Sequence, residues 1–185
     1  ELPMASSVEV FASDSLQHTG SLSLGIMDEG SLTWFDRLGD GWLAAFAHYD
    51  GQGGTDFKDH RFATINRYDH RWRRLGGWMI PDSITRQMQP YAALGGVLGA
   101  EGLLYLSGHD KPEVNVLAAP RMGPKLIHVA TISVDIEGQA IVWDDSAERV
   151  LIGISRSSRE IKTFQIPPVP VPAGYSRLTE ANFML

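Results

Sequence analysis

Gly41-Trp42-Leu43-Ala44-Ala45-Phe46-Ala47-His48 is a run of apolar residues that starts at a turn glycine and ends at a histidine. Two later stretches align with it: 102–109, which reads GLLYLSGH, and 149–156, which reads RVLIGISR. The last residues of the three stretches are separated by 61 and then by 47 residues. Each interval has room for four short strands, and a degenerate four-stranded repeat of this length is typical of a β-propeller.

The chain on either side of these stretches has the same pattern of short apolar runs separated by turn residues. Short runs of apolar and β-branched residues are broken by Gly, Asp, Asn and Pro, and almost no segment has a helical period, which indicates antiparallel hairpins. Asp40-Gly41 is a strong signal for a tight turn between two of the runs. The expected strands cover residues 8–11, 18–24, 31–36, 41–48, 62–68, 72–79, 95–98, 103–107, 114–117, 126–132, 139–143, 150–154 and 161–166.

These strands fall into groups of two, four, four and three. We therefore expect an all-β protein, a β-propeller with about three and a half four-stranded blades over residues 1–166, followed by a Pro-rich C-terminal tail over 167–185. A two-sheet β-sandwich is the alternative. Because closed propellers use at least four blades, three interpretations stay open: part of a larger propeller, which we prefer, a ring closed by a second copy, or a small irregular propeller whose N-terminal hairpin completes the last blade.

Composition excludes several classes of function. The 185 residues carry a formal net charge of −6, which argues against nucleic-acid binding and against an electrostatic membrane anchor. No apolar run reaches the roughly 18 residues of a membrane helix, so we expect a soluble protein, and no signal peptide is recognised in the given sequence. The absence of Cys excludes disulfides, thiolate nucleophiles and Cys-ligated zinc, and leaves the compartment open.

Four short phrases resemble the large propeller superfamily that includes the NHL, YVTN and gluconolactonase-type proteins. They are Val8-Glu9-Val10-Phe11, the stretch 63–69 (ATINRYD), the stretch 113–117 (EVNVL) and the octapeptide 102–109. The resemblance covers roughly residues 8–166 and implies a propeller fold. Such proteins include lactonases, lyases, cofactor-dependent dehydrogenases and pure binding modules, so the resemblance does not determine the function.

The aligned second strands suggest where chemistry would take place. In a propeller their ends lie at equivalent places around the ring, which here are occupied by His48, His109 and Arg156. Asp50 and Asp110 follow the two histidines closely. Because neutral imidazole is a good base near neutral pH and a nearby carboxylate can orient the ring, we predict catalytic roles for the histidines and substrate-binding roles for the two aspartates.

The Gly-rich loop after His48 adds a third histidine, His60. If the loop folds over the channel mouth, His48, His60 and His109 form a three-histidine site that would hold a divalent metal ion such as Zn²⁺ and activate water. Two alternatives remain open: a metal-free acid–base or binding role, and a purely structural one in which His48 and His109 cap strand ends and His60 is solvated.

Two first-strand residues, Trp34 and Gln139, take corresponding positions that face the channel or its mouth, so we expect both to contact substrate, and Arg156 to bind an anionic group. The leading hypothesis is an enzyme acting on a small polar or sugar-derived substrate. The alternatives are a non-catalytic propeller that binds a protein partner, and a fragment whose function depends on further blades. We expect no nucleic-acid or membrane partner and keep a homo-oligomer as an option.

Overall fold

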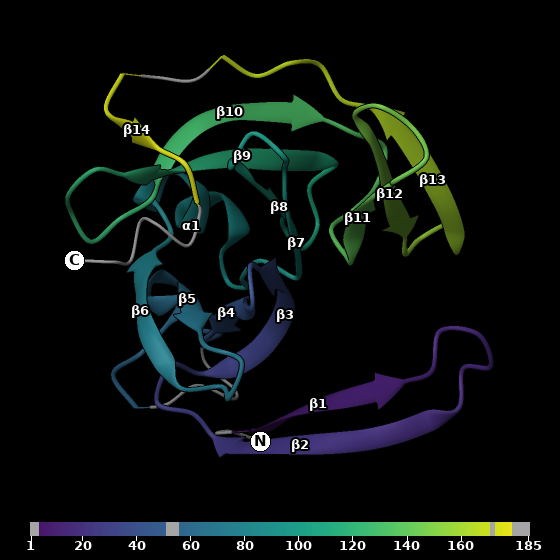
Figure 1. Ribbon diagram of the computed structural model, residues 1–185. Coiled ribbons are helices and arrows are strands. Elements are labelled where there is room, and N and C mark those ends of the chain that lie inside the picture. The colour runs from purple at the N-terminus through teal and green to yellow at the C-terminus, as the bar shows by residue number, and fades with distance from the viewer. Residues whose placement is uncertain (1–3, 51–55, 171–172, 179–185) are drawn as a thin grey trace.

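The computed structural model describes residues 4–50, 56–170 and 173–178, and these form an all-β protein made of several antiparallel sheets (Figure 1). The expectation of an all-β fold is therefore confirmed. Within the described residues, one short α-helix and one 3-10 turn interrupt the strands, and no helix is long and apolar enough to cross a membrane.

Three of the sheets consist of strands that follow one another in the chain and pair in that order. The first is β3 (Ser31–Leu38), β4 (Gly41–Ala47), β5 (Thr64–Tyr68) and β6 (Arg74–Met79). The second is β7 (Gly95–Leu98), β8 (Leu104–Ser107), β9 (Glu113–Pro120) and β10 (Ile127–Ser133), with β14 (Tyr175–Ser176) added beside β9. The third is β11 (Ile141–Trp143), β12 (Val150–Ser155) and β13 (Glu160–Gln165).

The first strands of the three sheets meet near the centre of the molecule, where β7 lies between β3 and β11 (Figure 1). Two glycines of β7 make this approach possible. A Cβ added to Gly96 would lie 2.5 Å from the indole of Trp34, and one added to Gly95 would lie 2.1 Å from the backbone oxygen of Gln139. Ser107 of the neighbouring strand also donates to that oxygen at 2.6 Å.

Both faces of the second sheet are buried along β8 and β9. Leu104 and Leu106 of β8 pack into a core shared with the first sheet, whereas Tyr105 and Leu103, the residue before β8, belong to a core shared with the third sheet. Successive side chains of a strand point to opposite faces, so a strand covered on both faces reads as an uninterrupted apolar run. This explains the sequence Leu103-Leu104-Tyr105-Leu106, in which every residue is fully buried.

Several elements differ from those expected. The fourth strand begins at Arg74, not at residue 72, because Trp72 ends a turn with a positive φ of 60° and donates its backbone N–H to Asp69. The helix α1 (Asp82–Met88) was not predicted from the sequence. Only three of its residues, Ile84, Thr85 and Met88, are buried, a helical pattern too short to recognise.

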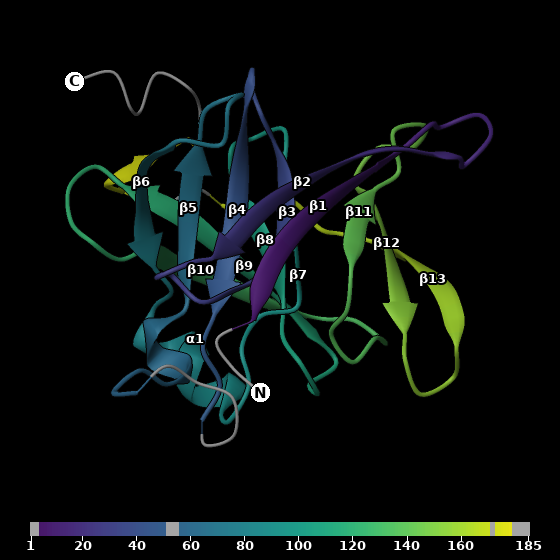
Figure 2. The same cartoon turned by 90° about the horizontal axis from the view of Figure 1, so that it is seen from below.

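The N-terminal pair β1 (Ala5–Phe11) and β2 (His18–Ile26) forms a separate hairpin, which lies below the sheets in Figure 1 and crosses in front of β3 and β4 in Figure 2. It is joined to the body near its base, where the backbone N–H of Leu32 donates to Ser6 Oγ at 3.1 Å. The hairpin does not pair with the third sheet in the described residues, so that sheet is three-stranded.

The described part of the C-terminal tail returns to the body. Tyr175 and Ser176 pair with β9, and Leu178 is buried in the core between the first two sheets. Residues 175–178 of the tail therefore pack on the chain's own second sheet. Within the expected tail, residues 171–172 and 179–185 lie outside the described residues.

We predict that Gly95→Ala lowers the free energy of unfolding by about 1–3 kcal/mol, since overpacking a rigid contact costs that much. Gly96→Ala should act in the same direction. Gly20→Ala in β2 is the matched control, because a Cβ there meets nothing within 4 Å and the backbone is not left-handed. Urea unfolding measures all three, and equal stabilities of Gly95→Ala and the control would contradict the proposed close approach.

Candidate functional site

The second strands of the three sheets end on the same side of the molecule. β4, β8 and β12 each run antiparallel to the preceding first strand, so their C-terminal ends lie opposite the hairpin turns that join each pair. His48, His109 and Arg156 each follow one of these ends within two residues. The structure thus places the three predicted positions at equivalent ends of neighbouring sheets.

His109 and Arg156 are brought together by one carboxylate. Nδ1 of His109 lies 2.6 Å from Oδ1 of Asp110, and Nη2 of Arg156 donates to the same oxygen at 2.9 Å. This chain of three residues joins the second sheet to the third.

The hydrogen bond from His109, followed by that from Arg156, lowers the pKa of Asp110. The carboxyl group is therefore ionised at neutral pH and accepts hydrogen bonds only. Nδ1 of His109 therefore donates to this carboxylate, and in the singly protonated form of the ring the lone pair lies on Nε2. No group in the described residues hydrogen-bonds to Nε2, so this atom is available to a ligand.

The His109 ring is also held from its face. Tyr91 stacks on it with a centroid separation of 3.8 Å and an interplanar angle of 17°, and Tyr49 meets the edge of Tyr91 at 6.0 Å. A ring oriented by a carboxylate at one edge and by an aromatic face has little freedom, which is what an acid–base or ligand-binding imidazole requires.

Beside His109 lies a cavity of about 220 Å³. It accommodates a small molecule only, since drug-sized pockets begin at about 300 Å³. Its wall combines an imidazole, both signs of charge, amides and one apolar side chain: Gln87, Met88, Gln89, Gly108, His109, Asp110, Lys111 and Glu113.

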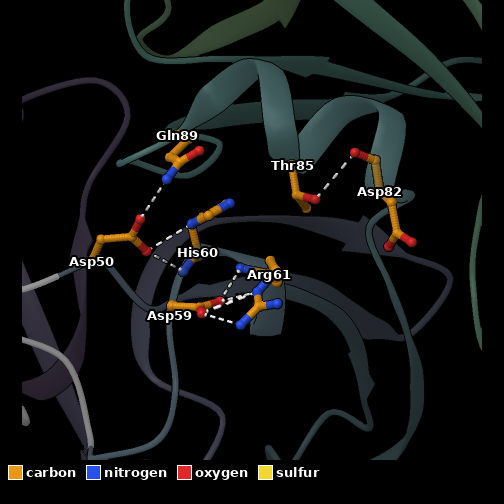
Figure 3. A network of polar contacts seen from close by, with 7 residues as sticks. All are labelled: Asp50, Asp59, His60, Arg61, Asp82, Thr85 and Gln89. Carbon is orange, nitrogen blue, oxygen red and sulfur yellow. Dashed lines mark hydrogen bonds and ion pairs between the residues drawn. The ribbon is translucent and has the colours of Figure 1, made fainter.

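Asp50 and His60 form a second imidazole–carboxylate pair (Figure 3). Asp50 Oδ1 lies 2.6 Å from His60 Nδ1 and accepts the His60 backbone N–H at 3.1 Å, while its Oδ2 accepts from Gln89 Nε2 at 3.3 Å. The backbone N–H of Asp50 donates to the carbonyl of Pro90 at 3.1 Å. These bonds anchor the loop that carries Tyr91, the residue whose ring stacks on His109.

The structure does not bring the three histidines together. In the described part of the chain, the one group of three side chains whose possible metal-ligand atoms come within 4.8 Å of one another is Asp50, Asp59 and His60. Asp59 is already bound by the guanidinium of Arg61 at 2.6 Å, and Asp50 and His60 are hydrogen-bonded to each other (Figure 3). The predicted three-histidine metal site therefore has no geometric support in the described residues.

His48 lies in a different place, at a cavity of about 230 Å³ lined also by Glu29 and Lys58. Burial, followed by the nearby Lys58 charge, lowers its pKa, and its ring hydrogen-bonds to the backbone of Glu29. This agrees with the structural alternative for His48, in which the side chain caps a strand end. The same alternative expected a solvated His60, but His60 is buried.

The two first-strand candidates do not line the His109 cavity. Trp34 is buried against Gly96, and Gln139 contributes its backbone oxygen to the packing around Gly95. A substrate in the His109 cavity would therefore touch neither side chain, and the substrate contacts of Trp34 and Gln139 stay predictions.

Sequence reasoning missed Gln89, Tyr91, Lys111 and Glu137. Glu137 accepts from the backbone N–H of Arg156 at 3.0 Å and from the hydroxyl groups of Ser155 and Ser157. The hydrogen bond from Ser157 is the main reason why the pKa of Glu137 falls to about 2. Glu137 thereby holds the turn that presents Arg156 to Asp110. None of these four residues belongs to the aligned repeat, although Lys111 lies only two residues after His109.

Searches against protein-family models and against curated proteins gave no match for this chain.

We predict that Asp50→Ala lowers the free energy of unfolding by about 1–3 kcal/mol, because it leaves the buried donors of His60 without a partner. Asp56→Ala is the matched control, since Asp56 is an exposed aspartate of the same loop. Denaturant unfolding measures both variants. An Asp50→Ala protein as stable as the control would show that the network anchors nothing.

A second prediction concerns pH. Because the folded-state pKa of His48 lies below its ordinary value of 6.5, the unfolded chain binds more protons than the folded one as the pH falls through 6.5, and stability is lost on that side. His48→Gln should remove this part of the acid sensitivity, whereas His70→Gln, at an exposed position, should not. Urea midpoints at about pH 7.5 and 5.5 measure the difference. Equal acid sensitivity of His48→Gln and the wild type would contradict the prediction.

Proposed function

We propose that the three sheets are blades of a β-propeller and that the His109 face binds and hydrolyses a small, polar, sugar-derived ester such as a lactone. His109 is the general base in this proposal and Asp110 orients it. One observation carries the proposal: an ionised carboxylate holds Nδ1 of His109 at 2.6 Å while the same imidazole lines a small polar cavity.

The propeller interpretation is supported by the order of the strands. Each sheet is an antiparallel meander in chain order, and the innermost strands β3, β7 and β11 lie side by side (Figure 1). Closed propellers need at least four blades, so closure by further blades, by a second copy or by the N-terminal hairpin belongs to the proposal as three separate options.

The chemistry follows from the free lone pair on Nε2. His109 takes a proton from water while the water oxygen attacks the lactone carbonyl, and the imidazolium is stabilised by the Asp110 carboxylate. The tetrahedral intermediate then expels the ring oxygen, which receives the proton from Nε2. The product is a hydroxy acid, and the neutral imidazole is restored.

Lys111 is the cation that lines the cavity. In this proposal it faces the oxygen on which negative charge develops, and later the product carboxylate. Sequence analysis gave this anion-binding role to Arg156. Since the guanidinium of Arg156 is paired with Asp110, we now assign it to holding that carboxylate.

The test measures the hydrolysis of a panel of aldonolactones, and the readout is the amount of base needed to hold the pH constant as protons are released. We expect His109→Ala to lower kcat/KM by about 100-fold or more, the usual contribution of a general base, and Asp110→Asn to lower it in the same direction. His70→Ala, an exposed histidine outside the cavity, is the matched control.

Two results would overturn the proposal. One is that no lactone of the panel is hydrolysed faster than in buffer. The other is that His109→Ala hydrolyses its substrate as fast as His70→Ala while remaining folded by circular dichroism.

A protein-binding role is the second candidate, and it is favoured by the hairpin β1–β2. Val10, Phe11 and Leu16, at the turn end of this hairpin, are all at least half exposed, and patches of exposed apolar side chains mark protein-interaction surfaces. Capture of a protein partner that is abolished by Phe11→Ser and retained by His109→Ala would favour this candidate over the enzyme.

A further inference from the structure

The opposite end of the three sheets carries two larger cavities, of about 470 and 720 Å³. They adjoin, because the same residues line both: Leu98, Ala100, Trp143, Asp145 and Arg177. We call this combined hollow the Trp143 groove. Each of the two cavity volumes falls in the range of small-molecule sites, about 300–1,000 Å³.

The Trp143 groove is separate from the His109 site. Its walls include the turn between β7 and β8 and the turn between β11 and β12, whereas His109 and Arg156 follow the far ends of β8 and β12. The groove therefore lies at the other end of the same strands, and neither of its cavities contains a residue of the His109 cavity.

Trp143 is a rigid, half-buried aromatic wall of this groove. Its Nε1 donates to the backbone oxygen of Leu98 at 3.1 Å, and Tyr105 meets it edge-to-face at a centroid distance of 4.8 Å. The hydrogen bond connects the third sheet to the second. A ring fixed in this way loses little conformational entropy when a ligand packs on it.

Three charged side chains at the groove have no hydrogen-bond, ion-pair or cation–π partner among the described residues: Asp145, Glu148 and Arg177. Arg37, which also lines the groove, has its guanidinium 3.7 Å from the ring centroid of Trp42. Arg149 differs from them, since its guanidinium donates to the carbonyls of Ile166 and Pro167 at 3.0 and 2.7 Å. Arg177 is carried to the groove by the docked tail segment, because Ser176 pairs with β9 and Leu178 N donates to the carbonyl of Gly102. The groove thus presents two carboxylates as hydrogen-bond acceptors and one guanidinium as a donor around the fixed indole ring of Trp143.

The balance of charge indicates which ligand fits. Four carboxylates and three guanidinium groups line the two cavities, and two of the three unpartnered groups are negative. A phosphate or another strong anion is disfavoured at such a surface. A neutral polyhydroxylated ring suits it, because its C–H face carries a partial positive charge toward the negative face of an indole, and its vicinal hydroxyls pair with planar carboxylate and guanidinium groups.

We propose that the Trp143 groove binds a neutral oligosaccharide, with one pyranose ring against Trp143 and its hydroxyls bound by Asp145, Glu148 and Arg177. This site goes beyond the proposed hydrolysis at His109 and does not depend on it. A chain with both sites would hold a glycan at one end of its sheets while acting on a small substrate at the other.

The test is an NMR titration with maltotriose, cellotriose and N-acetylated chitotriose, each up to about 10 mM, which detects binding weaker than millimolar. The indole N–H signal of Trp143, assigned with Trp143→Phe, is the readout. We expect one trisaccharide to shift this signal to saturation. His109→Ala should bind the same sugar unchanged, which separates this proposal from the enzymatic one.

Two exposed residues give the matched variants. Asp145→Ala and Arg177→Ala should each weaken binding by about tenfold, the effect of losing a charge-assisted hydrogen bond. Asp14→Ala and Arg121→Ala remove the same charges at exposed positions outside the groove and should not change it. Absence of any shift with all three sugars, a shift produced by inorganic phosphate or adenosine instead, or equal affinity of the Asp145→Ala and Asp14→Ala proteins would each overturn the proposal.

Discussion

The close packing of β3, β7 and β11 is the constraint on which the rest of the structure depends. Gly95 and Gly96 have no side chains, so the indole of Trp34 and the backbone of Gln139 can occupy the space next to β7. With the first strands this close, both faces of β8 and β9 become buried. The same approach aligns the ends of the second strands, which brings Asp110 of one sheet against Arg156 of the next.

The two ends of the sheets then differ in kind. At one end, Asp50 is bonded to His60 and Asp110 to His109 and Arg156, and these two imidazole–carboxylate pairs are linked through Gln89, Pro90 and Tyr91. At the other end, hairpin turns border the groove around Trp143, where Asp145, Glu148 and Arg177 have no hydrogen-bond or ion-pair partner in the described part of the chain. A prearranged imidazole suits chemistry on a small molecule, whereas an open groove with an aromatic wall suits the binding of a longer one.

Local features were predictable from the sequence. The octapeptide repeat identified β4, β8 and β12, and the adjacency of His109 and Asp110 identified the pair that the structure joins. Features that depend on contacts between sheets were not predictable. Tyr91 stacks on His109 from a loop that is hydrogen-bonded to Asp50. Glu137 accepts a hydrogen bond from the backbone of Arg156 at the end of β12. His48 and His109 follow equivalent strands but line different cavities. Sequence periodicity predicts which face of a strand Trp34 and Gln139 occupy. It does not predict how closely the neighbouring strands pack on that face, so a channel was expected there.

Native-state hydrogen exchange measures most directly whether the three sheets form one unit around β7. We predict that the slowest amides of β4, β8 and β12 exchange with one common opening free energy, equal to that of global unfolding. The amides of the β1–β2 hairpin should exchange with a lower opening free energy. Exchange of β11–β13 in a separate unit of much lower stability would contradict the account, because the third sheet would then not depend on the glycine-mediated contact.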